Sequence, residues 1–127
     1  MSGVSGQRSR RGRLAWSAGR RAEAVAAMLL MAKGFRILAR RFACPAGEID
    51  LVAGRGRLLV IVEVKARADA GLAAESITLR QRRRINRAAE AYLQIRPDLA
   101  GRDLRFDAVV SGRGGWPQHI ADAWRPE

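Results

Sequence analysis

Residues 47–66 read GEIDLVAGRGRLLVIVEVKA, and they predict two β-strands joined by a tight turn. The two halves, Glu48–Ala53 and Leu58–Ala66, are rich in leucine and β-branched residues, which favour strands. Between them, Gly54-Arg55-Gly56-Arg57 has the alternating glycines typical of a hairpin loop. We therefore expect an antiparallel hairpin here.

The alternation of side chains along the second strand gathers its charges on one face, because successive strand residues point to opposite faces. One face takes Leu59, Ile61, Glu63 and Lys65, and the other takes Leu58, Val60, Val62 and Val64. A two-residue Arg55-Gly56 turn would pair Asp50 with Ile61 on the first face. The same register would place Glu48 opposite Glu63. Two or three carboxylates and one ammonium group would then converge.

Carboxylates in so apolar a segment need compensation, because burying an unpaired charge is costly. A divalent cation would supply it. Oxygen ligands from Asp50, Glu63 and the Val64 carbonyl, completed by water and a phosphate oxygen, suit Mg²⁺ or Mn²⁺. Such a metal could polarise a phosphodiester and help to ionise a water. The alternative is an ion-pair network on an exposed sheet face.

Lysine is rare in this chain: of its 24 basic residues, only Lys33 and Lys65 are lysines. A guanidinium is planar and is never deprotonated in proteins. A lysine beside two carboxylates therefore suggests that Lys65 orients or activates an attacking water. A chance placement, with Lys65 simply pairing Glu63, stays open.

Two helices are expected outside the hairpin. Residues Ala18–Lys33 are strong helix formers followed by Gly34, the usual residue just past a helix C-terminus. Thr78 can cap a second helix through a capping box with Gln81, and Pro97 ends that helix. Apolar residues at helical spacing mark its buried side: Ile85, Ala88, Ala89, Tyr92 and Leu93.

Further strands are expected at Phe35–Phe42 and Leu104–Val110, whereas the pattern of Trp116–Trp124 is ambiguous. The predicted class is α/β, with a central mixed β-sheet flanked by helices. A chain of 127 residues fits one domain, which we place at residues 18–127. Residues 1–17 contain Gly, Ser and Arg without any acid, and they predict a basic flexible arm or a solvated tail.

The charge balance points to a polyanionic partner, because 24 basic and 12 acidic residues give a net charge of +12. Nucleic acid is the first candidate and an anionic membrane the second. Five arginines lie off the apolar stripe of the second helix and are candidate nucleic-acid-binding residues: Arg80, Arg82, Arg83, Arg84 and Arg87. The alternative is a solvated helix face.

The sequence also bears on location. The longest uncharged stretch of the hydrophobic N-terminal half, Ala24–Ala32, is far shorter than the ~20 apolar residues of a membrane span, so no membrane partner is expected. The single cysteine, Cys44, fits a reducing compartment, and we expect a cytoplasmic protein.

Other polar and aromatic residues have weaker functional readings. His119 is the only histidine, which argues against a His-rich zinc site and favours a structural role. Asp107 could support the acidic site or pair with a neighbouring arginine. The tryptophans could stack on unpaired bases, but core burial is expected for Trp116 and Trp124, and Trp16 is left open.

The segment Gly47-Glu48-Ile49-Asp50-Leu51-Val52, followed by Glu63-Val64-Lys65, resembles the Asp…Glu-x-Lys core of the PD-(D/E)xK nuclease superfamily. Within it the chain is most similar to the YraN-like family, itself similar to Holliday-junction resolvases. The other segments that fit are Gly19–Ala26 with Glu23, Tyr92-Leu93, Arg105-Phe106-Asp107 and His119-Ile120. The pattern departs at Ile49, which replaces a proline, and at Arg41, which stands where this family often has asparagine.

This resemblance implies a restriction-endonuclease-like fold and assigns roles to four residues. Asp50 and Glu63 would be Mg²⁺ or Mn²⁺ ligands, and Lys65 the catalytic lysine. Glu23 is similar to the helix-borne acidic residue of resolvase-like sites, although an ion pair with Arg20 would also explain it.

The expected function is that of a Mg²⁺-dependent DNA endonuclease, with branched or junction DNA among its candidate substrates and a homodimer as one candidate assembly. The first alternative is a catalytically inactive nucleic-acid-binding module of the same fold. The second is a basic protein packed into an RNA assembly.

Overall fold

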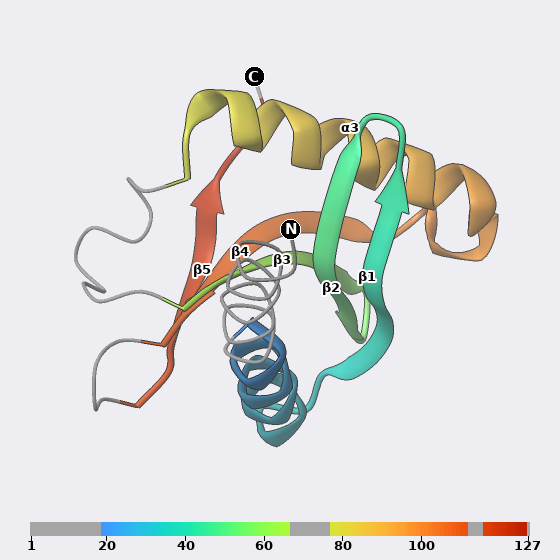
Figure 1. Ribbon diagram of the computed structural model, residues 1–127. Coiled ribbons are helices and arrows are strands. Elements are labelled where there is room, and N and C mark those ends of the chain that lie inside the picture. Colours follow the sequence, from blue (N-terminus) through green and yellow to red (C-terminus); the bar gives the residue numbers. More distant parts are fainter. Residues whose placement is uncertain (1–18, 67–76, 112–115, 127) are drawn as a thin grey trace, which may run out of the picture.

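The computed structural model describes residues 19–66, 77–111 and 116–126, and it shows a five-stranded mixed sheet with a helix on each face (Figure 1). The strands, in both sequence and sheet order, are β1 (Arg36–Cys44), β2 (Gly47–Arg55), β3 (Leu58–Lys65), β4 (Asp103–Val110) and β5 (Gln118–Trp124). Only β3 and β4 are parallel neighbours; the other three pairs of this sheet are antiparallel. The α/β, restriction-endonuclease-like class is confirmed. The predicted arm at residues 1–17 lies outside the described residues.

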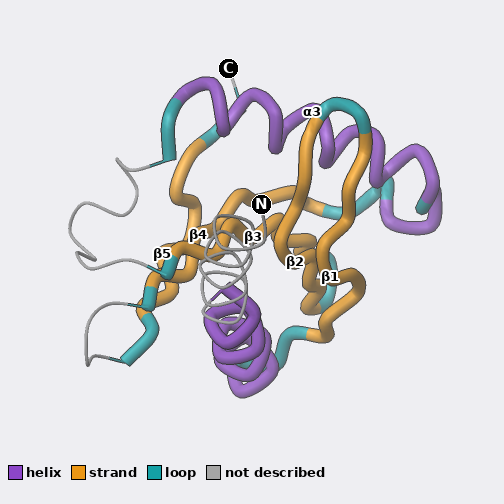
Figure 2. The backbone as a smooth tube through the Cα atoms, in the orientation of Figure 1, coloured by secondary structure: helices purple, strands orange, loops and turns teal. Residues whose placement is uncertain are grey.

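The two helices lie on opposite faces of the sheet (Figure 2). Each face carries one apolar cluster. Helix α3 (Leu79–Ile95) joins β3 to β4, as parallel strands require a crossover connection. It packs the predicted stripe against Val52, Leu59 and Ile61. The helix at residues 19–32 packs on the opposite face, over Val60 and Val62. The predicted division of β3 into two faces is therefore confirmed.

The predicted ends of α3 are also confirmed. The Gln81 amide donates to Thr78 Oγ1 at 3.2 Å, and the Thr78 amide donates to Gln81 Oε1 at 3.0 Å, which completes the capping box. A short 3₁₀ turn, η2 (Pro97–Leu99), follows the helix. Among the described residues, no helix is long and apolar enough to cross a membrane.

The hairpin forms as predicted, but the predicted register is wrong. Arg55 pairs with Leu58, so the two turn residues are Gly56 and Arg57 rather than Arg55 and Gly56. Gly56 has φ +58°. Two-residue hairpin turns need such a positive φ, which glycine adopts without strain. Continued from Leu51↔Val62, this register puts Asp50 opposite Glu63. In the predicted pairs, Asp50 with Ile61 and Glu48 with Glu63, the partners are displaced by two residues, an even shift that leaves the faces unchanged.

The ambiguous C-terminal segment is the edge strand β5. Trp124 is buried and lies 5.4 Å from the Phe106 ring, as measured between ring centroids. The predicted burial of Trp116 is wrong, because its side chain is 91% exposed. Trp116 precedes Gln118, the first residue of β5 to pair with β4, so it lies outside the packed sheet.

Candidate functional site

Two carboxylates on neighbouring strands meet on the α3 side of the sheet. Asp50 lies on β2 and Glu63 on β3, and both are largely buried. Asp50 Oδ2 accepts a hydrogen bond of 2.8 Å from the Val64 amide, which fixes the Asp50 carboxylate beside β3. This acidic pair opens into a hollow of about 180 Å³ lined by Glu48, Asp50, Glu63, Gln81, Arg84 and Ile85. We call it the acidic hollow.

The acidic pair is electrostatically unfavourable as it stands. Burial raises the pKa of Asp50, against the opposing effect of the hydrogen bond from the Val64 amide. Burial, followed by the negative charge of Asp50, raises the pKa of Glu63 to about 8. Lys65 offsets only part of this rise. A bound cation would therefore relieve repulsion that the neighbouring side chains leave in place.

Lys65 completes the group. Its Nζ lies 3.6 Å from Glu63 Oε1, because two residues separated by one position on a strand share a face. The fold thus brings together Asp50, Glu63 and Lys65 on two adjacent strands. The Val64 amide contact was not foreseen, since a backbone donor leaves no signal in the sequence.

The donor set fits a hydrated hard cation. Over residues 19–66, 77–111 and 116–126, no three His, Cys, Asp or Glu side chains form a metal-binding group. Mg²⁺ does not need such a group, because it keeps several waters and usually binds one or two carboxylates. Asp50 and Glu63 match that requirement, whereas a closed zinc site takes four protein ligands.

Glu23 lies close to the acidic pair but binds an arginine. Arg41 Nε lies 2.9 Å from both oxygens of the Glu23 carboxylate, and Arg41 Nη2 lies 2.9 Å from Oε2. The charge of Glu23 contributes to the raised pKa of Asp50, behind burial of that carboxyl. The structure therefore shows Arg41 of β1 as an ion-pair partner of Glu23, which the sequence did not suggest.

Arg41 has φ +54°, in the left-handed region that asparagine tolerates better than arginine. The asparagine that the family resemblance leads us to expect here would adopt this backbone with less strain. The bidentate contact with Glu23 compensates here for the strained backbone.

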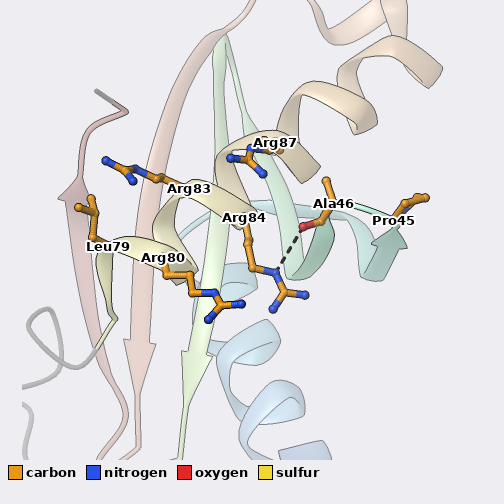
Figure 3. Close-up of a pocket in the computed structure, with 7 residues that line it drawn as sticks. All are labelled: Pro45, Ala46, Leu79, Arg80, Arg83, Arg84 and Arg87. Carbon is orange, nitrogen blue, oxygen red and sulfur yellow. Dashed lines mark hydrogen bonds between the residues drawn. The ribbon is translucent and has the colours of Figure 1, made fainter.

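The arginines of α3 line a groove next to the acidic hollow. Four of them, with part of the β1–β2 turn, enclose about 800 Å³ (Figure 3). The lining of this basic groove is Pro45, Ala46, Leu79, Arg80, Arg83, Arg84 and Arg87. Arg84 lines both the groove and the acidic hollow, and its Nε donates to the Ala46 carbonyl at 3.4 Å. The two spaces therefore adjoin at Arg84.

Glycine at position 47 permits this junction. A Cβ atom there would lie 3.0 Å from the Arg84 carbonyl oxygen, so any larger residue would push α3 away from the turn. Of the predicted arginines, Arg82 is set apart: it is half-buried and lines a different hollow, with Arg125.

The arginines also occupy the unfavourable end of the helix. The first turn of α3 reads Leu-Arg-Gln-Arg, and two more arginines follow it. The N-terminus of a helix is the positive end of its dipole, where acidic residues or anions are stabilising. This arrangement lowers the stability of the free protein and favours binding of an anion.

Asp107 belongs to a separate buried network. It accepts hydrogen bonds of 2.8 Å from Arg105 Nε and Nη2, one of 2.7 Å from His119 Nε2, and one of 3.0 Å from the Asp122 amide. The predicted ion pair with a neighbouring arginine is confirmed. Asp107 pairs with Val62, whose side chain faces the helix at residues 19–32, so Asp107 lies on the opposite face of the sheet from the acidic pair.

His119 links this network to the other lysine. Lys33 Nζ lies 2.9 Å from His119 Nδ1. An ammonium group can only donate, so Nδ1 is the acceptor and the ring proton is on Nε2, which donates to Asp107. The structural role predicted for His119 is confirmed, and Lys33 holds a defined position as well.

Comparison with known proteins shows close relatives. Residues 22–110 match the family described as "Uncharacterised protein family UPF0102". A UPF0102 protein of Parvibaculum lavamentivorans is 53% identical over 115 residues, which cover 91% of this chain and 86% of the relative. A UPF0102 protein of Caulobacter vibrioides is 45% identical over 121 residues, covering 95% of this chain and 97% of the relative.

Proposed function

We propose that this chain, which belongs to the uncharacterised protein family UPF0102, is a metal-dependent endonuclease that hydrolyses phosphodiester bonds of DNA. UPF0102 is the YraN-like, PD-(D/E)xK nuclease-like group. The observation that carries the proposal is the junction at Arg84, where a groove lined by four arginines adjoins the acidic hollow, whose lining includes Asp50 and the Glu63 that pairs with Lys65. The groove would bind the phosphate backbone and the acidic pair would act on it.

The side chains have separate roles in this mechanism. Asp50 and Glu63 would hold Mg²⁺ or Mn²⁺, which supplies charge stabilisation and helps to ionise water when bound. Lys65, anchored by Glu63, would orient the attacking water by donating a hydrogen bond from Nζ to the water oxygen. Arg84 would fix the phosphate next to the cleaved bond, because a guanidinium pairs with two phosphate oxygens at once.

Two observations favour a second candidate function, a catalytically inactive nucleic-acid-binding module. In the described part of the chain, no three acidic, histidine or cysteine side chains form a metal-binding group, and the nearby Glu23 is bound to Arg41. Such a module would keep the basic groove and bind nucleic acid without turnover.

Cleavage assays separate the two functions. Wild-type protein is expected to cut at least one substrate from a panel of junction, flapped, single-stranded and duplex DNA when Mg²⁺ is present, in the cytoplasmic pH range. Lys65→Ala and Asp50→Asn should lose cleavage and keep binding. Lys33→Ala, which removes the other lysine, is the matched control and should cut like wild type. Binding without cleavage by the wild type on every substrate would support the inactive module.

The proposed metal site also predicts a thermal response. Mg²⁺ or Mn²⁺ should raise the melting temperature of the wild type, corresponding to about 2.7 kcal/mol at a hundred times the Kd. Asp50→Asn and Glu63→Gln should each lose most of that rise, because they remove a ligand. Asp103→Asn, at an exposed carboxylate at the other end of the sheet, is the control. An undiminished response in both site variants would contradict the site.

A further inference from the structure

Another hollow adjoins the basic groove on the side away from the acidic pair. It measures about 130 Å³ and is lined by Leu79, Arg82, Arg83, Asn86 and Arg125. We call it the arginine hollow. Leu79 and Arg83 line both it and the basic groove. In Figure 3 these two side chains lie at the left of the view, away from Arg84 and Ala46. The arginine hollow therefore continues the basic surface around α3.

Asn86 is oriented as a hydrogen-bond donor in this hollow. Trp124 Nε1 donates to Asn86 Oδ1 at 3.2 Å. An indole N–H can only donate, so the amide oxygen must face Trp124 and the NH₂ group is left for a ligand. Trp124 is itself buried against Phe106, which fixes the position of its N–H.

The charge and size of the arginine hollow suit one phosphate group. Three guanidinium groups and one amide donor line a space of about four waters, at roughly 30 Å³ per water, which is large enough for one tetrahedral oxyanion. Arg125 pairs with Asp122 at 3.0 Å, but the arginine is 84% exposed, and exposed pairs of this kind hold a side chain weakly. Its guanidinium can therefore turn to an anion. The positive end of the α3 dipole adds to the attraction.

We propose that the arginine hollow binds one backbone phosphate of the nucleic-acid substrate, so that the substrate crosses the outer side of α3 from the acidic pair to Arg125. This inference rests on the proposed function, because it takes its ligand from the same substrate. It adds Asn86 and Arg125 as binding residues. Inorganic phosphate offers the same chemistry from another source, and the two sources are distinguished below.

The test uses the full chain and two variants. Asn86→Asp keeps an acceptor for the Trp124 N–H but replaces the donor by a negative charge. Arg125→Gln removes an exposed cation and should fold normally. Arg96→Gln is the matched control, since Arg96 also forms a local ion pair, with Asp98, but at the C-terminal end of α3. Duplex DNA binding is measured in EDTA over a range of NaCl concentrations, and melting temperature is measured with inorganic phosphate.

In the log-log salt plot, Arg125→Gln should reduce the slope by about 0.9, the value for one phosphate contact on duplex DNA. Asn86→Asp should weaken binding, and Arg96→Gln should leave the slope unchanged. Phosphate should raise the melting temperature of the wild type and not that of Asn86→Asp.

Two results would overturn the inference. If phosphate stabilises only proteins with an intact hollow but the DNA slopes do not change, the hollow binds free phosphate and not the substrate. If Arg96→Gln reduces the slope as much as Arg125→Gln, the effect is one of net charge. Because binding is measured without metal, neither result contradicts the proposed cleavage activity. A failure of the proposed cleavage activity would appear separately, in the cleavage assay.

Discussion

Replacing Lys65 by arginine is expected to slow DNA cleavage by about 10²–10⁴-fold, the usual contribution of a group that transfers or positions a proton. The variant keeps the positive charge and the ion pair with Glu63, whose Oε1 lies 3.6 Å from Nζ in the wild type. It introduces a larger, planar group with no accessible neutral form. The chemistry should therefore fail while the fold and DNA binding survive.

The measurement is a single-turnover cleavage rate with Mg²⁺, together with DNA affinity and melting temperature for the same preparation. Lys33→Arg is the matched control, because it makes the same exchange at the other lysine, on the opposite side of the sheet. A Lys65→Arg protein that cuts as fast as the wild type would show that Lys65 only pairs Glu63.

Removing the Asp107 carboxylate is expected to cost about 3 kcal/mol of stability at neutral pH, because it leaves Arg105 and His119 without their buried partner. The Asp107 side chain is fully buried. Asp107→Ala should therefore unfold at much lower urea concentrations than the wild type. Asp98→Asn, at an exposed ion pair, should change almost nothing. Equal unfolding midpoints for Asp107→Ala and wild type would contradict the importance of the network.

The Asp107 carboxylate should also make the stability of the protein depend on pH in the acid range. Burial would raise the pKa of Asp107, but the hydrogen bonds from His119, Arg105 and the Asp122 amide outweigh it and lower the pKa from 3.8 to about 2. The unfolded chain therefore takes up the proton first as pH falls. About 2 kcal/mol of stability, present above pH 4, should be lost as pH falls towards 2. Asp107→Asn should lack this part of the acid dependence in urea titrations.

Elements with a local signal could be predicted from the sequence. The capping box of Thr78 and Gln81 and the apolar stripe of α3 depend on residues three or four positions apart, and both were predicted correctly. The convergence of Asp50, Glu63 and Lys65 followed from strand alternation together with a turn of two residues, whose exact position does not change the faces. The turn was misplaced by one residue because glycine suits either position of a two-residue turn: Gly56 was predicted at the second position and is found at the first. Gly54 is buried in β2, where a Cβ would lie 3.2 Å from Arg102 Nη1.

Contacts between distant segments could not be predicted. Arg41 reaches Glu23 across 18 positions, and Lys33 reaches His119 across 86. No spacing rule relates such residues, because their proximity depends on how the helix at residues 19–32 packs on the sheet. The pairing of Asn86 with Trp124, which orients the amide in the arginine hollow, is of the same kind.

The two-residue turn at Gly56 and Arg57 sets a rule for insertions and deletions in this hairpin. One residue gained or lost there would rotate Asp50 onto the opposite face, among the apolar side chains under the helix at residues 19–32, unless a bulge absorbed the change. A gain or loss of two residues would return Asp50 to the face it shares with Glu63. The turn can therefore vary in length by even steps while the acidic pair survives, whereas odd steps separate Asp50 from Glu63.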